Sequence, residues 1–128
     1  MLETARYHEG KLKMPTKENA KDLIAMGYRL LGVNKNSVTI YAKPFGYGLF
    51  TVSFEGGIPV FRQRFKDLQG AIAVWSSFNF NGETYATFLD WLKYAETWHA
   101  RSGLEVGIGS SFEFLTAEQL VEDHCSGD

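Results

Sequence analysis

Hydrophobic and polar residues repeat with two different periods along this chain, and the changes of period predict its secondary structure. Residues 15–27 carry apolar side chains at helical spacing, with Thr16 able to cap the first turn and Gly27 able to end the helix in a left-handed conformation. From residue 28 to residue 65 the period is two, which is typical of half-buried strands. The segments that fit it are 28–33, 37–43, 48–54 and 58–65.

The connections between these four segments are short, so we expect neighbouring strands to be antiparallel, because a parallel pair needs a long crossover. One face of the predicted sheet is apolar and should meet a core; it carries Val38, Ile40, Ala42, Phe50, Val52 and Phe54. The other face is polar to amphipathic and carries Thr39, Tyr41, Lys43, Thr51 and Ser53. We expect the helices to cover the apolar face.

Helical spacing returns after residue 65. A first helix is predicted over residues 67–78, with an apolar stripe of Leu68, Ala71, Ile72, Trp75 and Phe78. A longer one is predicted over residues 83–100, ended by Ser102 and Gly103. Residues 104–114 fit either a hairpin or a loop with strand-like ends.

The two ends of the chain are less regular. Thr116 and Gln119 have the spacing of a capping box for a short last helix, followed by a flexible tail at residues 125–128. Residues 1–14 fit an ordered arm or an edge strand. The whole pattern predicts a single α+β domain over residues 1–128: an N-terminal helix, a four-stranded antiparallel meander, then two to three helices packed on one face of the sheet.

The stretch KPFGYGLF, residues 43–50, resembles the RNP1 signature by which RRM domains stack RNA bases on aromatic side chains. Two positions depart from that signature: Pro44 stands where it has Gly, and Gly48 where it has an aliphatic residue. Pro44 has no N–H for a central strand, and glycines so close together weaken a strand interior. Four successive strands also do not fit the RRM order. We therefore interpret the stretch as a hairpin turn.

The aromatic and basic residues around this turn still offer a candidate surface for single-stranded nucleic acid or an acidic protein segment. Its residues are Tyr41, Lys43, Phe45, Tyr47, Arg62 and Arg64. In the alternative interpretation, Phe45 and Tyr47 fold back onto the edge of the sheet, and the cations only keep that edge soluble.

Composition narrows the class of protein. Hydrophobic residues make up 45% and charged residues 22%, as in ordinary globular domains, and no apolar run reaches the roughly 20 residues of a membrane span. The start of the chain shows no secretory signal, and the one cysteine, Cys125, excludes an internal disulfide. We expect a cytoplasmic protein that does not contact membranes.

The charges are divided unequally along the chain. Residues 1–66 carry eleven Lys/Arg against five Asp/Glu, whereas residues 67–128 carry two against ten. Such a division indicates either a basic face for an acidic partner or two halves whose charges neutralise each other in the folded domain.

No constellation of residues predicts a catalytic, metal or cofactor site. The three histidines have no metal-ligand spacing to one another or to other ligand types, and His124 and Cys125 lie near the chain end. Glu96 and His99 stand three apart on the predicted long helix, which is suitable for acid–base work, but no nucleophile accompanies them. The glycines of residues 107–111 precede a strand-like segment rather than a helix, so they do not predict a phosphate loop.

The predicted long helix is apolar over an arc of about 220°, wider than the stripe somewhat over 100° that docking on a sheet requires. The surplus is a ridge formed by Trp91, Tyr94 and Trp98. Either the predicted helix 67–78 covers this ridge as ordinary core, or the ridge closes a two-fold homodimer, since Trp and Tyr dominate interface energetics.

The leading hypothesis is a small non-enzymatic protein-interaction domain that associates with itself; its size suits a bacterial or mobile-element accessory protein. The alternatives are a single-stranded nucleic-acid-binding module and, last, a small enzyme that uses Glu96 and His99.

Overall fold

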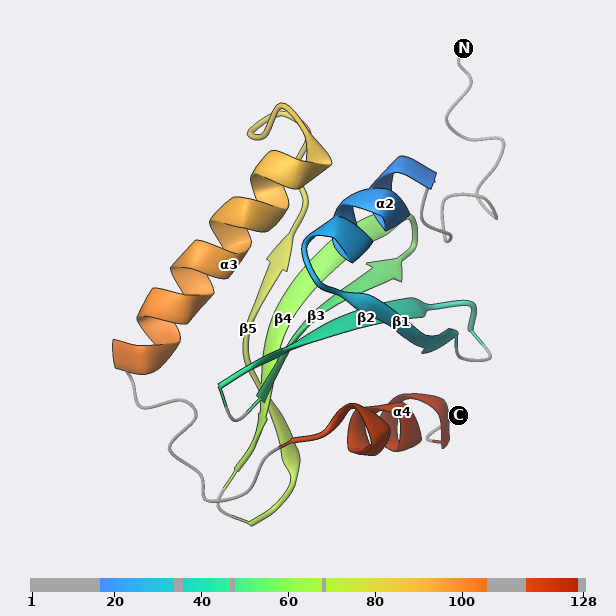
Figure 1. Cartoon of the computed structure of the whole chain (residues 1–128), viewed down its shortest axis with the longest axis vertical. Helices are drawn as coiled ribbons and strands as arrows, with labels where there is room; N and C mark the ends of the chain where they lie inside the picture. Colours follow the sequence, from blue (N-terminus) through green and yellow to red (C-terminus); the bar gives the residue numbers. More distant parts are fainter. Residues whose placement is uncertain (1–16, 34–35, 47, 68, 106–114, 127–128) are drawn as a thin grey trace.

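The computed structural model describes residues 17–33, 36–46, 48–67, 69–105 and 115–126 and has the α+β architecture that the sequence predicts (Figure 1). Along the chain the elements are α2 (Lys17–Ala25), β1 (Arg29–Val33), β2 (Thr39–Phe45), β3 (Gly48–Glu55), β4 (Ile58–Lys66), β5 (Ile72–Asn79), α3 (Phe88–Glu105) and α4 (Ala117–Ser126). The five strands form one antiparallel sheet in the order β1-β2-β3-β4-β5. The prediction of an antiparallel meander is confirmed, but it has five strands rather than four.

Helix α2 ends as the sequence predicts. Gly27 has a φ of 99°, a left-handed conformation that glycine adopts without steric cost. The N–H of Tyr28 donates to the carbonyl oxygen of Leu23 at 2.9 Å, closing the helix end. The chain then passes directly into the edge strand β1.

The stretch that resembles RNP1 is a hairpin turn, as interpreted. Phe45 pairs with Gly48 across the turn, and Gly46 has a φ of 59°. Pro44 lies beyond the last residue of β2 that pairs with β1, so its missing N–H breaks no hydrogen bond of that strand pair. Gly48 is required for another reason: a Cβ atom there would overlap the carbonyl oxygen of Arg64 on β4.

The predicted helix over residues 67–78 is wrong, because Ile72–Asn79 form strand β5. Arg62 pairs with Ser77, but Arg64 pairs with Val74, so β5 carries one extra residue in a β-bulge. The bulge interrupts the period of two, which is why the apolar residues of this strand fall at helical spacing. Asp67 also resembles the start of a helix in the sequence, because its carboxylate accepts the N–H groups of Gln69 and Ala71, as the side chain of a helix cap would.

Helix α3 begins later and ends later than predicted. Thr87 is its cap, with the hydroxyl accepting the N–H of Asp90 at 3.0 Å, and the helix continues past Gly103 to Glu105. Helix α4 has the predicted capping box: the hydroxyl of Thr116 accepts the backbone N–H of Gln119 at 3.2 Å, and the side-chain oxygen of Gln119 accepts the backbone N–H of Thr116 at 3.0 Å. It extends to Ser126, into the segment predicted to be a tail. The arm at residues 1–14, Tyr47 and the glycines of 107–111 lie outside the described residues.

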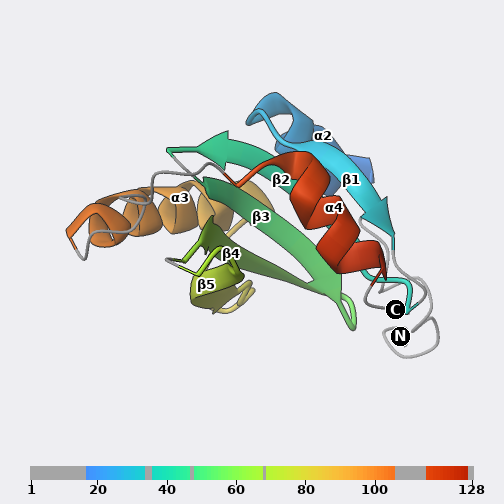
Figure 2. The same cartoon turned by 90° about the horizontal axis from the view of Figure 1, so that it is seen from below.

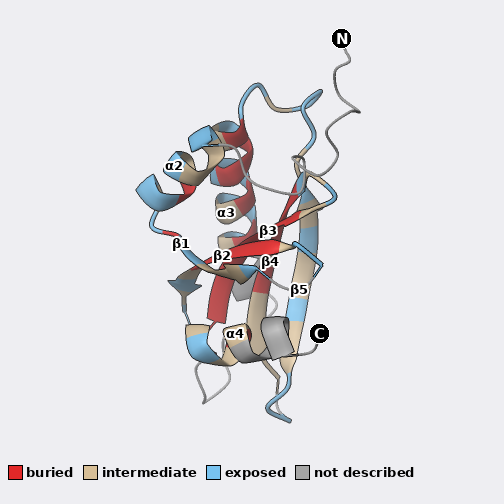
Figure 3. Ribbon diagram, turned by 90° about the vertical axis from the view of Figure 1, so that its right-hand side faces the viewer, coloured by how far each residue is buried: buried red, intermediate tan, exposed pale blue. Residues whose placement is uncertain are grey.

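The main core lies between the sheet and the pair α2 and α3, where α3 covers β4 and β5. The ribbon of the buried residues is coloured red in Figure 3. Its buried members are Leu23, Tyr28, Tyr41, Phe50, Val52, Phe54, Phe61, Phe88, Trp91, Leu92 and Ala95. The register places Tyr41 opposite Val52, so the two side chains share a face. The prediction that Tyr41 and Lys43 lie on the face away from Phe50 and Val52 is therefore wrong.

A second, smaller cluster lies on the opposite face and joins Ile40 and Leu49 to Leu115 and Leu120. Helix α4 supplies Leu120 and lies beside β1, below the sheet in Figure 1 and in front of it in Figure 2. The prediction that the helices pack on one face of the sheet is therefore not confirmed: α4 contributes to a different cluster from α2 and α3.

Candidate interaction surface

Helix α3 divides the predicted aromatic ridge between core and surface. Trp91 is fully buried, with its ring stacked on Phe78 at 6.4 Å and edge-on to Phe80 at 5.8 Å. Tyr94 and Trp98 remain 49% and 42% exposed. Trp91 is therefore corrected from an interface residue to a core residue, and the exposed pair Tyr94 and Trp98 is the candidate interaction surface.

The exposed pair is held in place by aromatic neighbours. The ring of Tyr94 lies 5.8 Å from the rings of both Phe78 and Tyr85, and the ring of Trp98 meets His99 edge-on at 4.8 Å. Phe78 comes from β5, so a strand takes the covering role that the sequence had assigned to a helix at residues 67–78. Because these contacts restrict the two side chains before any partner arrives, binding would cost little additional side-chain entropy.

His99 lies beneath Trp98 and is buried against Phe61, whose ring is 4.6 Å away. Its Nδ1 donates to the carbonyl oxygen of Ala95 at 2.8 Å, whereas Nε2 has no hydrogen-bond partner among the described residues. Burial lowers the pKa of His99 below its ordinary value, with the bond to Ala95 opposing this in part. Burial therefore favours the neutral form of the ring.

Glu96 points to a different group of residues from His99. Its Oε2 accepts the hydroxyl of Tyr28 at 2.6 Å and lies 2.8 Å from Nζ of Lys43. Nζ of Lys43 also donates to the carbonyl oxygen of Met26 at 2.9 Å and lies 5.1 Å from the centre of the Tyr28 ring. Burial raises the pKa of Tyr28 far above its usual range, and the charge of Glu96 adds to this.

This Tyr28–Lys43–Glu96 cluster ties the end of α2 and strand β2 to helix α3. No hydrogen bond joins Glu96 to His99 within the described part of the chain, so the acid–base pair that the sequence suggests is not assembled.

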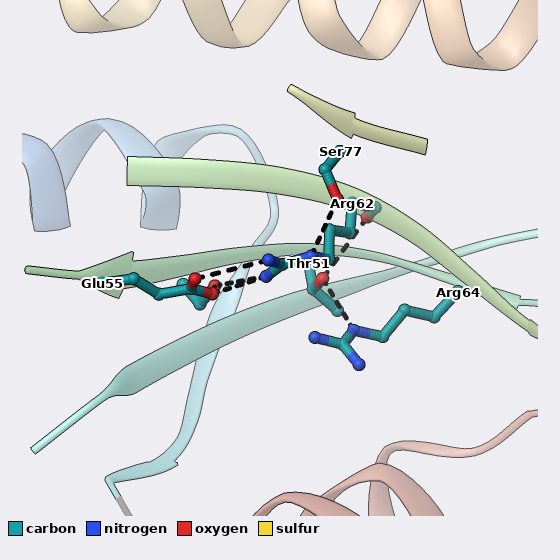
Figure 4. A network of polar contacts seen from close by, with 6 residues as sticks. Thr51, Glu55, Arg62, Arg64 and Ser77 are labelled. Atoms are coloured by element: carbon teal, nitrogen blue, oxygen red, sulfur yellow. Dashed lines mark hydrogen bonds and ion pairs between the residues drawn. The ribbon is translucent and has the colours of Figure 1, made fainter. Parts of the chain in front are cut away.

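A second polar network, centred on Arg62, lies on the face of the sheet that α2 and α3 do not cover (Figure 4). Its guanidinium donates to both carboxylate oxygens of Glu55, at 2.5 and 3.3 Å, to Ser53 at 3.1 Å and to Ser77 at 3.0 Å. These bonds to Arg62 lower the pKa of Glu55, against the opposing effect of burial. Arg64 donates from Nε to Thr51 at 3.1 Å.

The predicted nucleic-acid residues do not share one surface. Tyr41 is buried, and Phe45 stacks on Phe50 with ring centres 4.4 Å apart. Lys43 lies on the face that α2 and α3 cover, whereas Arg62 and Arg64 lie on the other face. Nucleic-acid binding by these residues stays a prediction, and the described members of the set do not form one continuous surface.

Sequence reasoning missed the Arg62 network, although a signal for it exists. Gly56 and Gly57 have φ values of 62° and 86°, the signature of a two-residue hairpin turn that pairs Glu55 with Ile58. Extending that register places Thr51 opposite Arg62, on the same face as Ser53 and Glu55. The turn residues therefore predict the network, provided that the register is followed.

A shallow cleft of about 310 Å³ lies between β1 and α4, lined by Arg29, Leu30, Leu31, Ala117, Glu118 and Val121. Among the described residues no group of His, Cys, Asp and Glu side chains is arranged to hold a metal ion. In the same part of the chain no helix combines the length and apolar character needed to cross a bilayer.

In comparisons with known proteins, no family model, no curated protein and no solved structure matched this chain. Proposals about its function therefore depend on the arrangement of its own side chains.

Proposed function

We propose that this chain is a non-enzymatic protein-interaction domain that associates with another copy of itself through Tyr94 and Trp98. The observation that carries the proposal is the exposure of these two large aromatic side chains one helical turn apart on α3. Trp and Tyr are enriched at interaction hot spots because they bury much apolar area with few rotatable bonds.

The polar side chains of the domain support an interaction role rather than a catalytic one. The carboxylate of Glu96 bonds to Tyr28 and Lys43, and the carboxylate of Glu55 bonds to Arg62. Both carboxylates serve contacts within the fold. We infer that the domain works in the cytoplasm, as the single cysteine indicates, and that it is an accessory protein of a bacterium or mobile element.

The test is the molar mass in solution, measured by light scattering from about 10 µM to about 1 mM protein, the range in which small interfaces associate. The mass should rise from 14.4 kDa toward twice that value. Trp98→Ala and Tyr94→Ala should each weaken association by about tenfold or more. Ile58→Ala, which shortens an exposed apolar side chain at the β3–β4 turn, is the matched control and should have no effect.

Two results reject the proposal. One is a monomer at every concentration. The other is a dimer that both aromatic variants retain at full strength while still giving the circular dichroism spectrum of the native domain.

A further inference from the structure

The exposed stripe of α3 contains charges as well as aromatics. At about 100° per residue, Asp90, Tyr94, Trp98 and Arg101 fall within an arc of about 80°. All four are exposed. Figure 1 shows α3 along the left side of the molecule, and none of the described elements lies beyond it.

This stripe is symmetric in its chemistry. Asp90 and Arg101 lie at equal distances from a point between residues 95 and 96, and Tyr94 and Trp98 lie at equal distances from residue 96. Reversing the helix end for end therefore exchanges acid with base and aromatic with aromatic. A two-fold axis requires this kind of self-complementary patch, because a contact between one residue of the first copy and another residue of the second copy is repeated with the two copies exchanged.

We propose that the partner of this surface is α3 of a second copy, packed antiparallel about a two-fold axis close to residue 96. This rests on the proposed function and specifies its geometry. Tyr94 packs against Trp98 of the partner subunit, and Asp90 forms an ion pair with Arg101 of the partner subunit. The two ion pairs lie on opposite sides of the aromatic centre.

The remaining side chains of the stripe fit this arrangement. Asp90 and Arg101 are both exposed, and within the described part of the chain neither takes part in an ion pair. The hydroxyl of Thr97, beside the aromatic pair, donates to the carbonyl oxygen of Lys93 at 2.9 Å. That hydroxyl is already satisfied within the helix, so covering it leaves no unmet hydrogen bond.

A different protein is the less suitable occupant, because it would not require one acid and one base at matched distances from the aromatic centre. A polyanion is also a poor fit, because the stripe carries no excess of positive charge. A single pair of helices is a small interface, so we expect a dissociation constant on the order of 100 µM.

Charge reversal tests the geometry directly. Asp90→Arg gives a stripe with two basic ends, and Arg101→Asp gives one with two acidic ends. Each variant alone would juxtapose like charges twice per dimer, so its dissociation constant should rise by about tenfold or more at low salt. An equimolar mixture of the two variants restores both opposite-charge contacts and should associate as well as the natural chain does, as should the double variant.

The controls are Glu18→Arg and Lys21→Glu, which make similar charge changes on the exposed side of α2. Neither should alter association, alone or mixed. Sedimentation velocity at about 50 mM and about 500 mM salt measures each dissociation constant, and the differences between variants should shrink at the higher salt.

The possible failures are distinguishable. If the natural chain is monomeric throughout, both the proposed function and this geometry are rejected. If it dimerises through Trp98 but the charge reversals have no effect, or the mixture fails to restore association, the antiparallel geometry is rejected and the protein-interaction role stands. Should a single variant fold poorly, the other single variant and the double variant still decide the question: the first should dimerise weakly, and the second should dimerise as well as the natural chain does.

Discussion

At the scale of single residues, His99 places two ring nitrogens inside an aromatic core, and only Nδ1 has a partner among the described residues. Protonation would create a charge between Phe61 and Trp98 with no carboxylate bonded to it. We therefore expect protonation of this ring to destabilise the folded domain, and we assign the ring no role in a reaction.

We expect His99 to lower the free energy of unfolding as the pH is lowered through a defined range. Its pKa is lowered on folding, so below its ordinary value of 6.5 the unfolded chain binds more protons than the folded one. The stabilisation is complete above about pH 6.5 and is lost as the pH falls through that value toward the lower folded pKa. Urea unfolding from pH 7.5 to 5 should show this loss in the natural chain and a flatter profile in His99→Leu.

The carboxyl group of Glu55 titrates outside the pH range of this measurement. The pKa of Glu55 is also lowered on folding, but its stabilisation disappears only below the ordinary carboxyl value of 4.5. Equal slopes for the natural chain and His99→Leu between pH 7.5 and 5 would therefore contradict the assignment to His99.

At the scale of the elements, the Tyr28–Lys43–Glu96 cluster makes a connection that apolar packing alone does not. Tyr28 follows α2, Lys43 lies on β2 and Glu96 lies on α3, so one carboxylate joins three segments that are far apart in sequence. The side chains of Lys43 and Glu96 are 24% and 16% exposed, and removing one partner leaves the other charge mostly out of water.

Lys43→Met should therefore lower the free energy of unfolding by about 1–3 kcal/mol, because it leaves the Glu96 carboxylate without its cation. Adding Glu96→Gln should recover part of that loss, since the remaining side chain is uncharged. Lys21→Met, at an exposed position on α2, is the control and should change stability by less than about 0.5 kcal/mol. Strictly additive losses in the double variant would indicate that the two charges do not interact.

The sequence predicted the elements whose signals are local. Four strands, the turn between β2 and β3, the end of α2 at Gly27 and the capping box of Thr116 and Gln119 all follow from side chains that act within a few residues of themselves. Strand β5 was missed because a bulge, which depends on pairing with β4, shifts its apolar residues to helical spacing.

Face assignments failed for a similar reason. Both faces of the sheet are covered, one by α2 and α3 and the other by α4, so apolar residues on β2 occur on either side. Alternation alone then does not distinguish Ile40, in the small cluster, from Tyr41, in the large one. For the candidate surface, periodicity located Tyr94 and Trp98, but the burial of Trp91 depends on Phe78 and Phe80, which were predicted in a helix and a loop.

At the scale of the whole molecule, the strongly basic and strongly acidic halves of the sequence are joined in the fold. Lys43 from the basic half pairs with Glu96 from the acidic half, while Arg62 pairs with Glu55 within the basic half. Some of the charges counted in each half therefore neutralise each other inside the fold. The net charge of −2 for the whole chain is a better guide to how the domain interacts than the net charge of either half.

The order of the strands in the sheet, which is also their order along the chain, has a consequence for the speed of folding. Each hairpin can form by closing a short loop, whereas Tyr28 meets Glu96 only after 68 residues have been brought together. We expect the β3–β4 hairpin to form before the rate-limiting barrier and α3 to dock against α2 after it.

Stopped-flow kinetics should then separate the two regions. Phe61→Leu in β4 should mainly slow refolding, and Lys43→Met should mainly accelerate unfolding, since its ion pair with Glu96 is absent at the barrier. The reverse pattern would mean that the contact between β2 and α3 comes first and that the meander assembles around it.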